Sequence, residues 1–323
     1  MVFAGAVTRI GTSDLDVFPI GLGCNVFGFT VSPEDTASIL DPWVDGGGNL
    51  LDTADSYSAW VPGNVGGESE TLIGEWLRRS GRRDEVVIAT KVAKHPEFQG
   101  LAPANVRAAA EASLRRMGID VIDLYYAHYD DPDLAMEEIV EGFASLVRDG
   151  LVRYVAVSNF EPARIEEWIR IAGDGPARPV AIQPHYNLVH RNDVEDHIIP
   201  IAEQHELSLI PYFGLARGFL TGKYRTKDIP EGASPRAQGA VKYVSPQGLE
   251  ILDTLDEIAK AHGVTPAAVA LAWLRAQPTV AAPLASATNP RQLAELLAAG
   301  QLELASDEVA ELTRVSTWTP PGA

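Results

Sequence analysis

Cysteine is nearly absent from this sequence: its 323 residues include only Cys24. A single thiol cannot form an internal disulfide, so a disulfide-stabilised secreted domain is excluded. The first residues, M-V-F-A-G-A-V-T-R-I-G, also lack the charged segment and the long apolar stretch of a signal peptide. We therefore expect a cytoplasmic protein, because thiols stay reduced in that compartment.

Long apolar runs and an excess of basic residues are missing as well. No stretch of about 18 uncharged apolar residues occurs, so we expect no transmembrane helix. Lys and Arg number 26 against 44 Asp and Glu, for a net charge of −18, and such a chain repels phosphate backbones and anionic lipid. We expect a small-molecule partner rather than nucleic acid or a membrane. The composition leaves the oligomeric state open.

Two common site motifs are also absent. No G-x-G-x-x-G follows a strand-like run, which argues against a Rossmann dinucleotide-binding fold. No group of His and Cys has the spacing of metal ligands, so we predict no metal site.

The sequence does contain a regular alternation of short apolar runs and helical segments. Eight runs read as strands, and they cover residues 18–23, 49–54, 86–92, 121–128, 152–159, 180–184, 207–212 and 279–285. Because these runs lack a clean polar alternation, both of their faces should be buried, as in a parallel sheet covered by helices. The periodicity predicts helices over residues 68–79, 104–118, 135–149, 162–171, 194–205 and 247–263.

This pattern favours the α/β class and a single (β/α)₈ TIM barrel domain over residues 1–323. Residues 7–17 read as a β-hairpin before the first barrel strand. Residues 56–67 and 214–246 are rich in Gly and Pro and lack a helical period. Such long loops in a compact barrel are usually binding loops or lids.

Polar residues end otherwise apolar strands, at the end of a barrel where chemistry takes place. They are Asp52, Lys91, His128, Ser158, Asn159, Gln183 and Tyr212. A buried Lys91 would be costly unless it is paired, and Asp52 on the neighbouring strand is the obvious partner. A structural explanation exists for each residue alone, but their convergence on one barrel end favours an active site.

Several motifs together resemble the aldo-keto reductase superfamily over nearly the whole chain. They are D-T-A-D-S-Y (52–57), G-E-S-E-T-L-I-G (67–74), I-A-T-K-V (88–92), L-R-R-M-G-I-D-V-I-D-L-Y-Y-A-H (114–128), V-R-Y-V-A-V-S-N-F (152–160), Q-P-H-Y-N (183–187) and L-A-R-G-F-L-T-G-K-Y (215–224). The resemblance implies a catalytic tetrad of Asp52, Tyr57, Lys91 and His128, and reduction of aldehydes or ketones by a nicotinamide cofactor.

The four residue types suit that chemistry. Tyr57 would give a proton to the carbonyl oxygen as hydride reaches the carbon. A lysine ammonium about 4 Å away stabilises a phenolate by up to roughly 4 kcal/mol at an effective dielectric of 20, so the resemblance implies that Lys91 lowers the pKa of Tyr57. Asp52 would orient Lys91, and His128 would donate to the carbonyl oxygen.

The resemblance also implies a set of cofactor residues. Ser158, Asn159 and Gln183 match carboxamide positions, and Tyr212 matches the aromatic that stacks on the nicotinamide. The remaining implied cofactor residues are Cys24, Asn25, Asp52, Phe213, Gly214, Leu215, Arg217, Gly218, Lys223, Arg236, Ser286, Thr288, Gln292 and Glu295. We expect NADP(H), because Lys223 and Arg236 favour a phosphate. NAD(H) stays the alternative, because Thr288 stands where Arg or Ser is common in the family.

The implied substrate pocket is aromatic and uncharged. Its expected residues are Phe27, Tyr57, Trp60, His128 and Tyr129, with Asn25, His95 and Phe98 as further candidates.

Two other activities stay open on the same fold. One is a cofactor-holding regulatory subunit, such as the potassium-channel β-subunits, in which the tetrad His is often Asn. The other is a Schiff-base lyase with Lys91 as its nucleophile, a reading that leaves the cofactor motifs without a role.

Overall fold

The structure is a computed structural model that describes residues 7–229 and 231–317. Eight parallel strands form one sheet in the spatial order β11-β10-β9-β8-β5-β4-β3-β12. Their bounds are β3 (Gly21–Gly23), β4 (Leu50–Asp52), β5 (Val87–Val92), β8 (Ile122–Ala127), β9 (Val152–Ser158), β10 (Pro179–Gln183), β11 (Ser208–Leu209) and β12 (Leu284–Ala285). All eight predicted strands are confirmed.

Hydrogen bonds across the two edges of this sheet close it into a barrel. The Leu209 amide donates to the Thr279 carbonyl at 2.8 Å, and the Ala281 amide donates to the Leu209 carbonyl at 2.9 Å. β11 and β12 are shorter than the predicted runs. Pro211 and Pro283 lie inside those runs, and proline has no amide hydrogen for a strand ladder.

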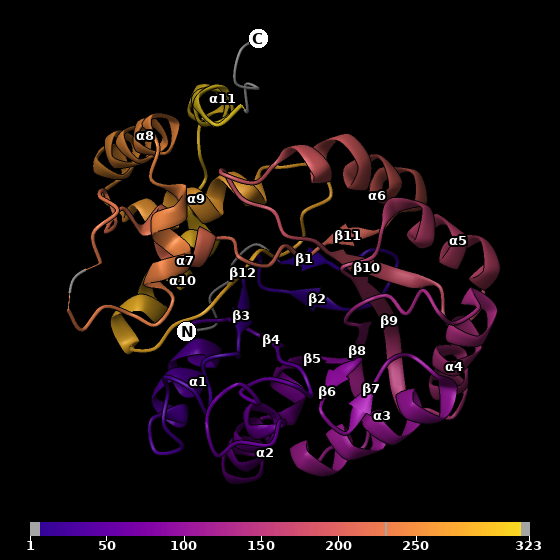
Figure 1. The fold of residues 1–323 in the computed structure, drawn as a ribbon. Coiled ribbons are helices and arrows are strands. Elements are labelled where there is room, and N and C mark those ends of the chain that lie inside the picture. The colour runs from indigo at the N-terminus through magenta and orange to yellow at the C-terminus, as the bar shows by residue number, and fades with distance from the viewer. Residues whose placement is uncertain (1–6, 230, 318–323) are drawn as a thin grey trace.

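Helices surround the strands on the outside (Figure 1). Their bounds are α1 (Thr36–Asp45), α2 (Glu68–Ser80), α3 (Pro103–Met117), α4 (Met136–Arg148), α5 (Pro162–Ala172), α6 (Ile199–His205), α7 (Ala237–Ala240), α8 (Pro246–His262), α9 (Pro266–Arg275), α10 (Pro290–Gln301) and α11 (Ser306–Val315). The (β/α)₈ fold is confirmed. The extent of the domain over residues 1–323 stays a prediction, and residues 1–6, 230 and 318–323 lie outside the described part.

The sequence pattern missed some helices for identifiable reasons. α9, P-A-A-V-A-L-A-W-L-R, is buried along almost its whole length, so it has no polar face to reveal a helical period. α1 contains Pro42. The segment 214–246 is not free of helix either, because it holds α7 and the two 3₁₀ turns η3 (Ala216–Thr221) and η4 (Val241–Tyr243).

Two hairpins flank the barrel. The predicted N-terminal hairpin is confirmed as β1 (Thr8–Arg9) paired antiparallel with β2 (Asp16–Val17). Its buried Ile10, Leu15 and Val17 pack with apolar side chains inside the barrel. A second hairpin, β6 (Lys94–His95) with β7 (Phe98–Gln99), directly follows β5 and was not predicted. Within the described residues, no helix is both long and apolar enough to cross a bilayer.

Candidate active site

The ammonium group of Lys91 is the centre of a buried polar cluster. Lys91 is 0% exposed and Asp52 is 2% exposed. The Lys91 Nζ donates to Asp52 Oδ1 at 2.6 Å, to the Thr53 carbonyl at 2.6 Å and to the Tyr57 hydroxyl at 3.1 Å. The other Asp52 oxygen accepts from Gln183 Nε2 at 2.9 Å. The expected Lys91–Asp52 pair is present, and its geometry fixes the position of the Tyr57 hydroxyl.

Burial and the Asp52 carboxylate raise the pKa of Tyr57 well above its usual value near 10. The charge of Arg236 opposes this shift, because a nearby cation favours the phenolate. The expected lowering of the pKa of Tyr57 is therefore not the net outcome, because burial and the charge of Asp52 dominate. Tyr57 consequently holds its proton at neutral pH, which is the state that a proton donor needs.

His128 lies beside Tyr57, at a distance of 6.1 Å between ring centroids. Burial, followed by the charges of Lys91 and Lys94, lowers the pKa of His128 well below 6.5. The imidazole is therefore neutral at physiological pH. Its Nδ1 atom is buried without a hydrogen-bond partner among the described residues.

The residues expected to hold a carboxamide meet at the ends of β9 and β10. The Asn159 side-chain amide donates to Ser158 Oγ at 3.0 Å and to the His128 carbonyl at 2.8 Å. The Tyr212 hydroxyl donates to Asn159 Oδ1 at 2.8 Å. Asn159 has a positive φ of 56°, a conformation more accessible to Asn than to most residues. The arrangement places amide and hydroxyl groups beside Asp52 and Gln183.

One cavity of about 1310 Å³ joins this centre to the predicted cofactor loop. Its walls include Asn25, Asp52, Tyr57, Trp60, His128, Tyr129, Ser158, Asn159, Gln183, Tyr212, Phe213, Gly214, Leu215, Arg217, Gly218, Lys223, Arg236, Ser286, Thr288, Gln292 and Glu295. Nearly all sequence-predicted site residues are thus brought together, although they come from every part of the barrel mouth.

The cations of this wall suit an anionic ligand. In the described part of the chain, Arg217, Lys223 and Arg236 form no ion pair with an acid. Arg236 donates instead to the side-chain oxygen of Asn25 at 2.9 Å, and burial with the nearby Arg217 lowers its pKa. A partly buried guanidinium without an acid is costly unless an anion occupies the space beside it. The donor set therefore fits the phosphates of a nicotinamide dinucleotide.

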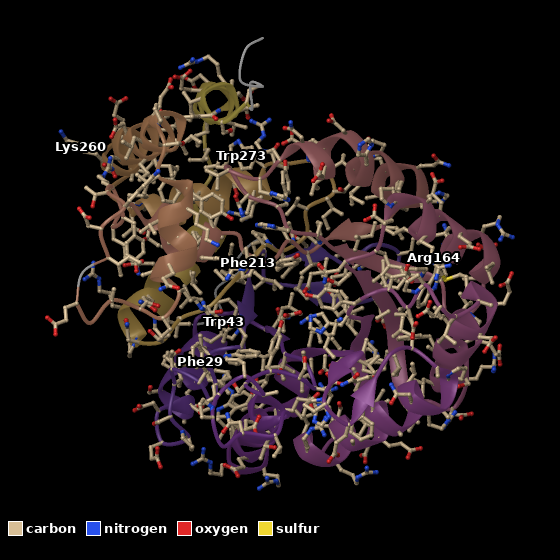
Figure 2. The ribbon with its side chains drawn as sticks, in the orientation of Figure 1. Phe29, Trp43, Arg164, Phe213, Lys260 and Trp273 are labelled. Carbon is tan, nitrogen blue, oxygen red and sulfur yellow. The ribbon has the colours of Figure 1, made fainter. Side chains whose placement is uncertain are left out.

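Backbone geometry shapes the same loop. Phe213, Ala216 and Arg217 have positive φ values of 56°, 47° and 59°, which non-glycine residues adopt rarely and at functional sites. The Arg217 guanidinium lies 4.3 Å from the centroid of the Phe213 ring. Phe213 lies near the barrel mouth, inside the ring of helices (Figure 2).

Five predicted residues lie outside the cavity walls. One is Lys91, which is fully buried and donates to the Tyr57 hydroxyl on the wall. Cys24 is fully buried and its thiol donates to the Leu22 carbonyl. Phe27 is also fully buried, and its carbonyl accepts from Ser58 Oγ at 2.8 Å. His95 and Phe98 pack on each other in the β6–β7 hairpin, 5.1 Å apart. The sequence alone does not distinguish a residue that packs beside the cavity from one that lines it.

Trp60 is exposed by 53% at the cavity edge. Its ring makes edge contacts with Tyr57 at 6.2 Å and with Phe29 at 5.9 Å. The loop that follows Tyr57 therefore does border the opening. Sequence reasoning missed Lys94, His185, Tyr243 and Arg291, which also line the cavity. Lys94 could have been found from its position three residues after Lys91, and the others carry no such signal.

Comparisons with known proteins agree with this geometry. The model of the Aldo/keto reductase family matches residues 19–317. The chain belongs to the aldo-keto reductase family. Protein tas of Escherichia coli (strain K12) is 32% identical, over 95% of this chain and 96% of its own length. Aldo-keto reductase yakc [NADP(+)] of Schizosaccharomyces pombe is 30% identical over 94% of this chain and 92% of its own.

A third relative has a different kind of name. The putative voltage-gated potassium channel subunit beta of Schizosaccharomyces pombe is 32% identical, over 89% of this chain and 86% of its own length. The predicted resemblance is confirmed, and membership of the aldo-keto reductase family makes the chain an NAD(P)H-dependent oxidoreductase.

Proposed function

We propose that this chain reduces aldehydes or ketones with NADPH, and that Tyr57 donates the proton to the carbonyl oxygen. The observation that carries this proposal is the Tyr57 hydroxyl held 3.1 Å from Lys91 Nζ, itself bonded to Asp52 at 2.6 Å, at the wall of a large cavity. NADPH, when bound, supplies hydride to the carbonyl carbon. All other roles belong to side chains of the protein.

Each member of the tetrad has a role that its environment supports. Tyr57 keeps its proton because burial raises its pKa, so it can donate to an oxygen that gains negative charge. Lys91 stabilises the phenolate left behind. Asp52 and Gln183 fix Lys91 through a connected set of hydrogen bonds. Neutral His128 donates a hydrogen bond to the carbonyl oxygen and orients it.

The cofactor residues follow the same cavity. Ser158, Asn159 and Gln183 would hold the carboxamide, and Tyr212, which donates to Asn159 Oδ1, would stack on the nicotinamide ring. Arg217, Lys223 and Arg236 would bind the phosphates, because none of these cations pairs with an acid among the described residues of an otherwise acidic protein. Ser286, Thr288, Gln292 and Glu295 border the adenosine end. Thr288 and Gln292 already share a hydrogen bond of 3.0 Å, so the preference for NADPH over NADH should be moderate.

The two alternatives fit less well. A lyase nucleophile needs a free lone pair on Lys91, but its Nζ donates to three oxygen acceptors. A purely regulatory subunit needs no proton relay, whereas His128 and Tyr57 both line the cavity. The relatives named as channel subunits keep this alternative open to test.

The deciding experiment is a titration of the protein with NADPH and NADH, followed by nicotinamide fluorescence, and then turnover on a panel of carbonyl compounds. We expect NADPH to bind more tightly, by less than about 100-fold, or roughly 2.7 kcal/mol. Tight NADPH binding with no turnover on any carbonyl would support the regulatory subunit. Borohydride trapping of substrate on the protein without cofactor would support the lyase.

A further inference from the structure

Lys94 is a cation at the substrate side of the cavity that the tetrad does not use. It begins the β6–β7 hairpin and lines the same cavity as Tyr57 and His128. Its Nζ atom lies 4.4 Å from the centroid of the Tyr129 ring. Its side chain is thereby aimed at an aromatic wall of the opening.

The backbone holds Lys94 in this place. Ala93 has a φ of 119°, a conformation that residues with a side chain rarely adopt and that persists only where surrounding contacts enforce it. The Gly100 amide donates to the Ala93 carbonyl at 3.1 Å, and Lys94 pairs with Gln99 across the hairpin. The sharp turn at Ala93 redirects the chain immediately after the buried strand that carries Lys91.

No acid in the described part of the chain forms an ion pair with Lys94. Among residues 7–229 and 231–317, no carboxylate lies within 4.0 Å of its ammonium. The two acids that follow Tyr129 have other partners: Asp130 pairs with Arg164 at 2.8 Å, and Asp131 accepts from the Leu101 amide at 3.0 Å. An unpaired cation beside the reaction centre stands out in a chain with a net charge of −18.

The cofactor phosphates do not account for Lys94. The cations assigned to them come from residues 217–236, which run from within η3 to the residue before α7. In the view of Figure 1, α7 lies to the left of β3 and β12, whereas the β6–β7 hairpin lies to their lower right. Lys94 is instead linked to the tetrad through aromatic rings, because Tyr129 lies 5.1 Å from His128, which lies 6.1 Å from Tyr57. Because Lys94 and Tyr57 line one cavity, an anion at Lys94 and a carbonyl at Tyr57 can belong to the same molecule.

We propose that Lys94 recognises an anionic group, a carboxylate or a phosphate, on the carbonyl substrate. This inference rests on the proposed function and gives it a substrate class: aldehydes or ketones with an anion a short distance from the carbonyl. Trp60 and Tyr129 flank the spacer, and Lys94 binds the charged end. The expected pocket of uncharged aromatic residues therefore gains one charged, specificity-determining member.

The test compares substrates that differ in charge but hardly in shape. The ratio of kcat/KM for 4-formylbenzoate to that for methyl 4-formylbenzoate is measured with NADPH for the unmodified protein and for Lys94→Met. We expect the ratio to fall by about fivefold or more in Lys94→Met, and further in Lys94→Glu. The preference of the unmodified protein should weaken as salt is added, because Lys94 is exposed. A second pair, 4-formylphenyl phosphate and 4-methoxybenzaldehyde, shows whether phosphate is favoured over carboxylate.

Lys260→Met is the matched control. Lys260 is an exposed lysine on α8, at the outer edge of the molecule and far from the barrel mouth (Figure 2), so its removal should leave both ratios unchanged. Equal ratios in the unmodified protein and in Lys94→Met would overturn the inference while the reductase activity stands.

Calorimetric binding of 4-formylbenzoate separates the inference from the proposed function. Binding that weakens in Lys94→Met, without turnover of any aldehyde, would overturn the proposed reaction and uphold anion recognition. Binding that is the same in both proteins would overturn the inference.

Discussion

Two clusters of buried ionisable groups lie close together around β5, and they are built very differently. The inner cluster is Asp52, Lys91 and Tyr57. The outer cluster, under α2 and α3, is Asp55, Glu70 and Arg116. Asp52 and Asp55 are three residues apart, and both are at most 2% exposed. Asp52 and Asp55 therefore belong to the same sequence motif but lie in different electrostatic environments.

The inner cluster satisfies its carboxylate fully. Asp52 accepts from Lys91 on one oxygen and from Gln183 on the other. In the outer cluster, Glu70 accepts from Thr90 Oγ1 at 2.6 Å and from Arg116 Nε at 2.6 Å. Among the described residues, both Asp55 oxygens lack a hydrogen-bond partner. Burial, followed by the charge of Glu70, raises the pKa of Asp55 well above its usual range.

The difference between Asp52 and Asp55 shows where the fold tolerates a buried carboxyl group without a hydrogen-bond partner. Asp52, which holds the proposed catalytic lysine, is fully paired, because a loose partner would let the ammonium move away from Tyr57. A carboxyl with no such task can remain buried and hold a proton. Four substitutions, two in each cluster, test this comparison.

The largest effect is expected for Lys91→Met. It should lower kcat by at least about 10³-fold, because the phenolate loses its cation, and should reduce stability by about 3–5 kcal/mol, because Asp52 is left buried and unpaired. Steady-state kinetics and urea unfolding measure the two effects. The double variant Asp52→Asn with Lys91→Met should recover much of the stability and none of the activity. Recovery of activity in the double variant would remove Lys91 from the mechanism.

Tyr57→Phe should lower kcat by at least about 10²-fold, the scale of losing a general acid. The ring remains, so the affinity for NADPH and the unfolding free energy should stay close to those of the unmodified protein. Single-turnover kinetics and fluorescence titration check both expectations. Near-normal turnover would show that another group supplies the proton.

Glu70→Gln should reduce stability by roughly 1–3 kcal/mol, because the partly buried Arg116 loses its charged partner. We expect a change in kcat of less than about threefold, because the outer cluster does not touch Tyr57. The loss should be measured by urea unfolding at pH 7. A fall in kcat comparable to that of Tyr57→Phe would mean that the two clusters act as one.

The smallest effect, of opposite sign, is expected for Asp55→Asn. The pKa of Asp55 is raised in the folded state, so the native protein binds more protons than the unfolded chain above a pH of about 4. The stabilising contribution of the protonated group is full below that pH and is lost as pH rises through the folded pKa. Asp55→Asn should therefore raise stability at pH 8, by about 1 kcal/mol, and this gain should vanish near pH 4. Thermal unfolding across this range measures it, and an equal change at every pH would contradict the assignment.

Sequence patterns were sufficient to predict the barrel fold and the polar residues at the ends of its strands. Apolar runs without alternation indicate strands buried on both faces, and the carboxyl ends of parallel strands must share one end of a barrel. Asp52, Lys91 and His128 could thus be grouped before any contact was known. The motif D-T-A-D-S-Y then added Tyr57 through a family resemblance, since a loop position carries no periodic signal.

Only the tertiary structure decided which groups are paired, buried or aimed at the opening. Desolvation depends on neighbours from distant segments, so the net raising of the pKa of Tyr57 was not visible in the sequence. Phe27 and Trp60 are both aromatic residues near the barrel mouth, yet Phe27 packs in the core and Trp60 is half exposed. Lys94 joins the cavity because the backbone turns sharply at Ala93. The sequence determines the chemistry that each side chain can perform. The tertiary structure determines its burial and its hydrogen-bond and charge partners, and these decide which chemistry it performs.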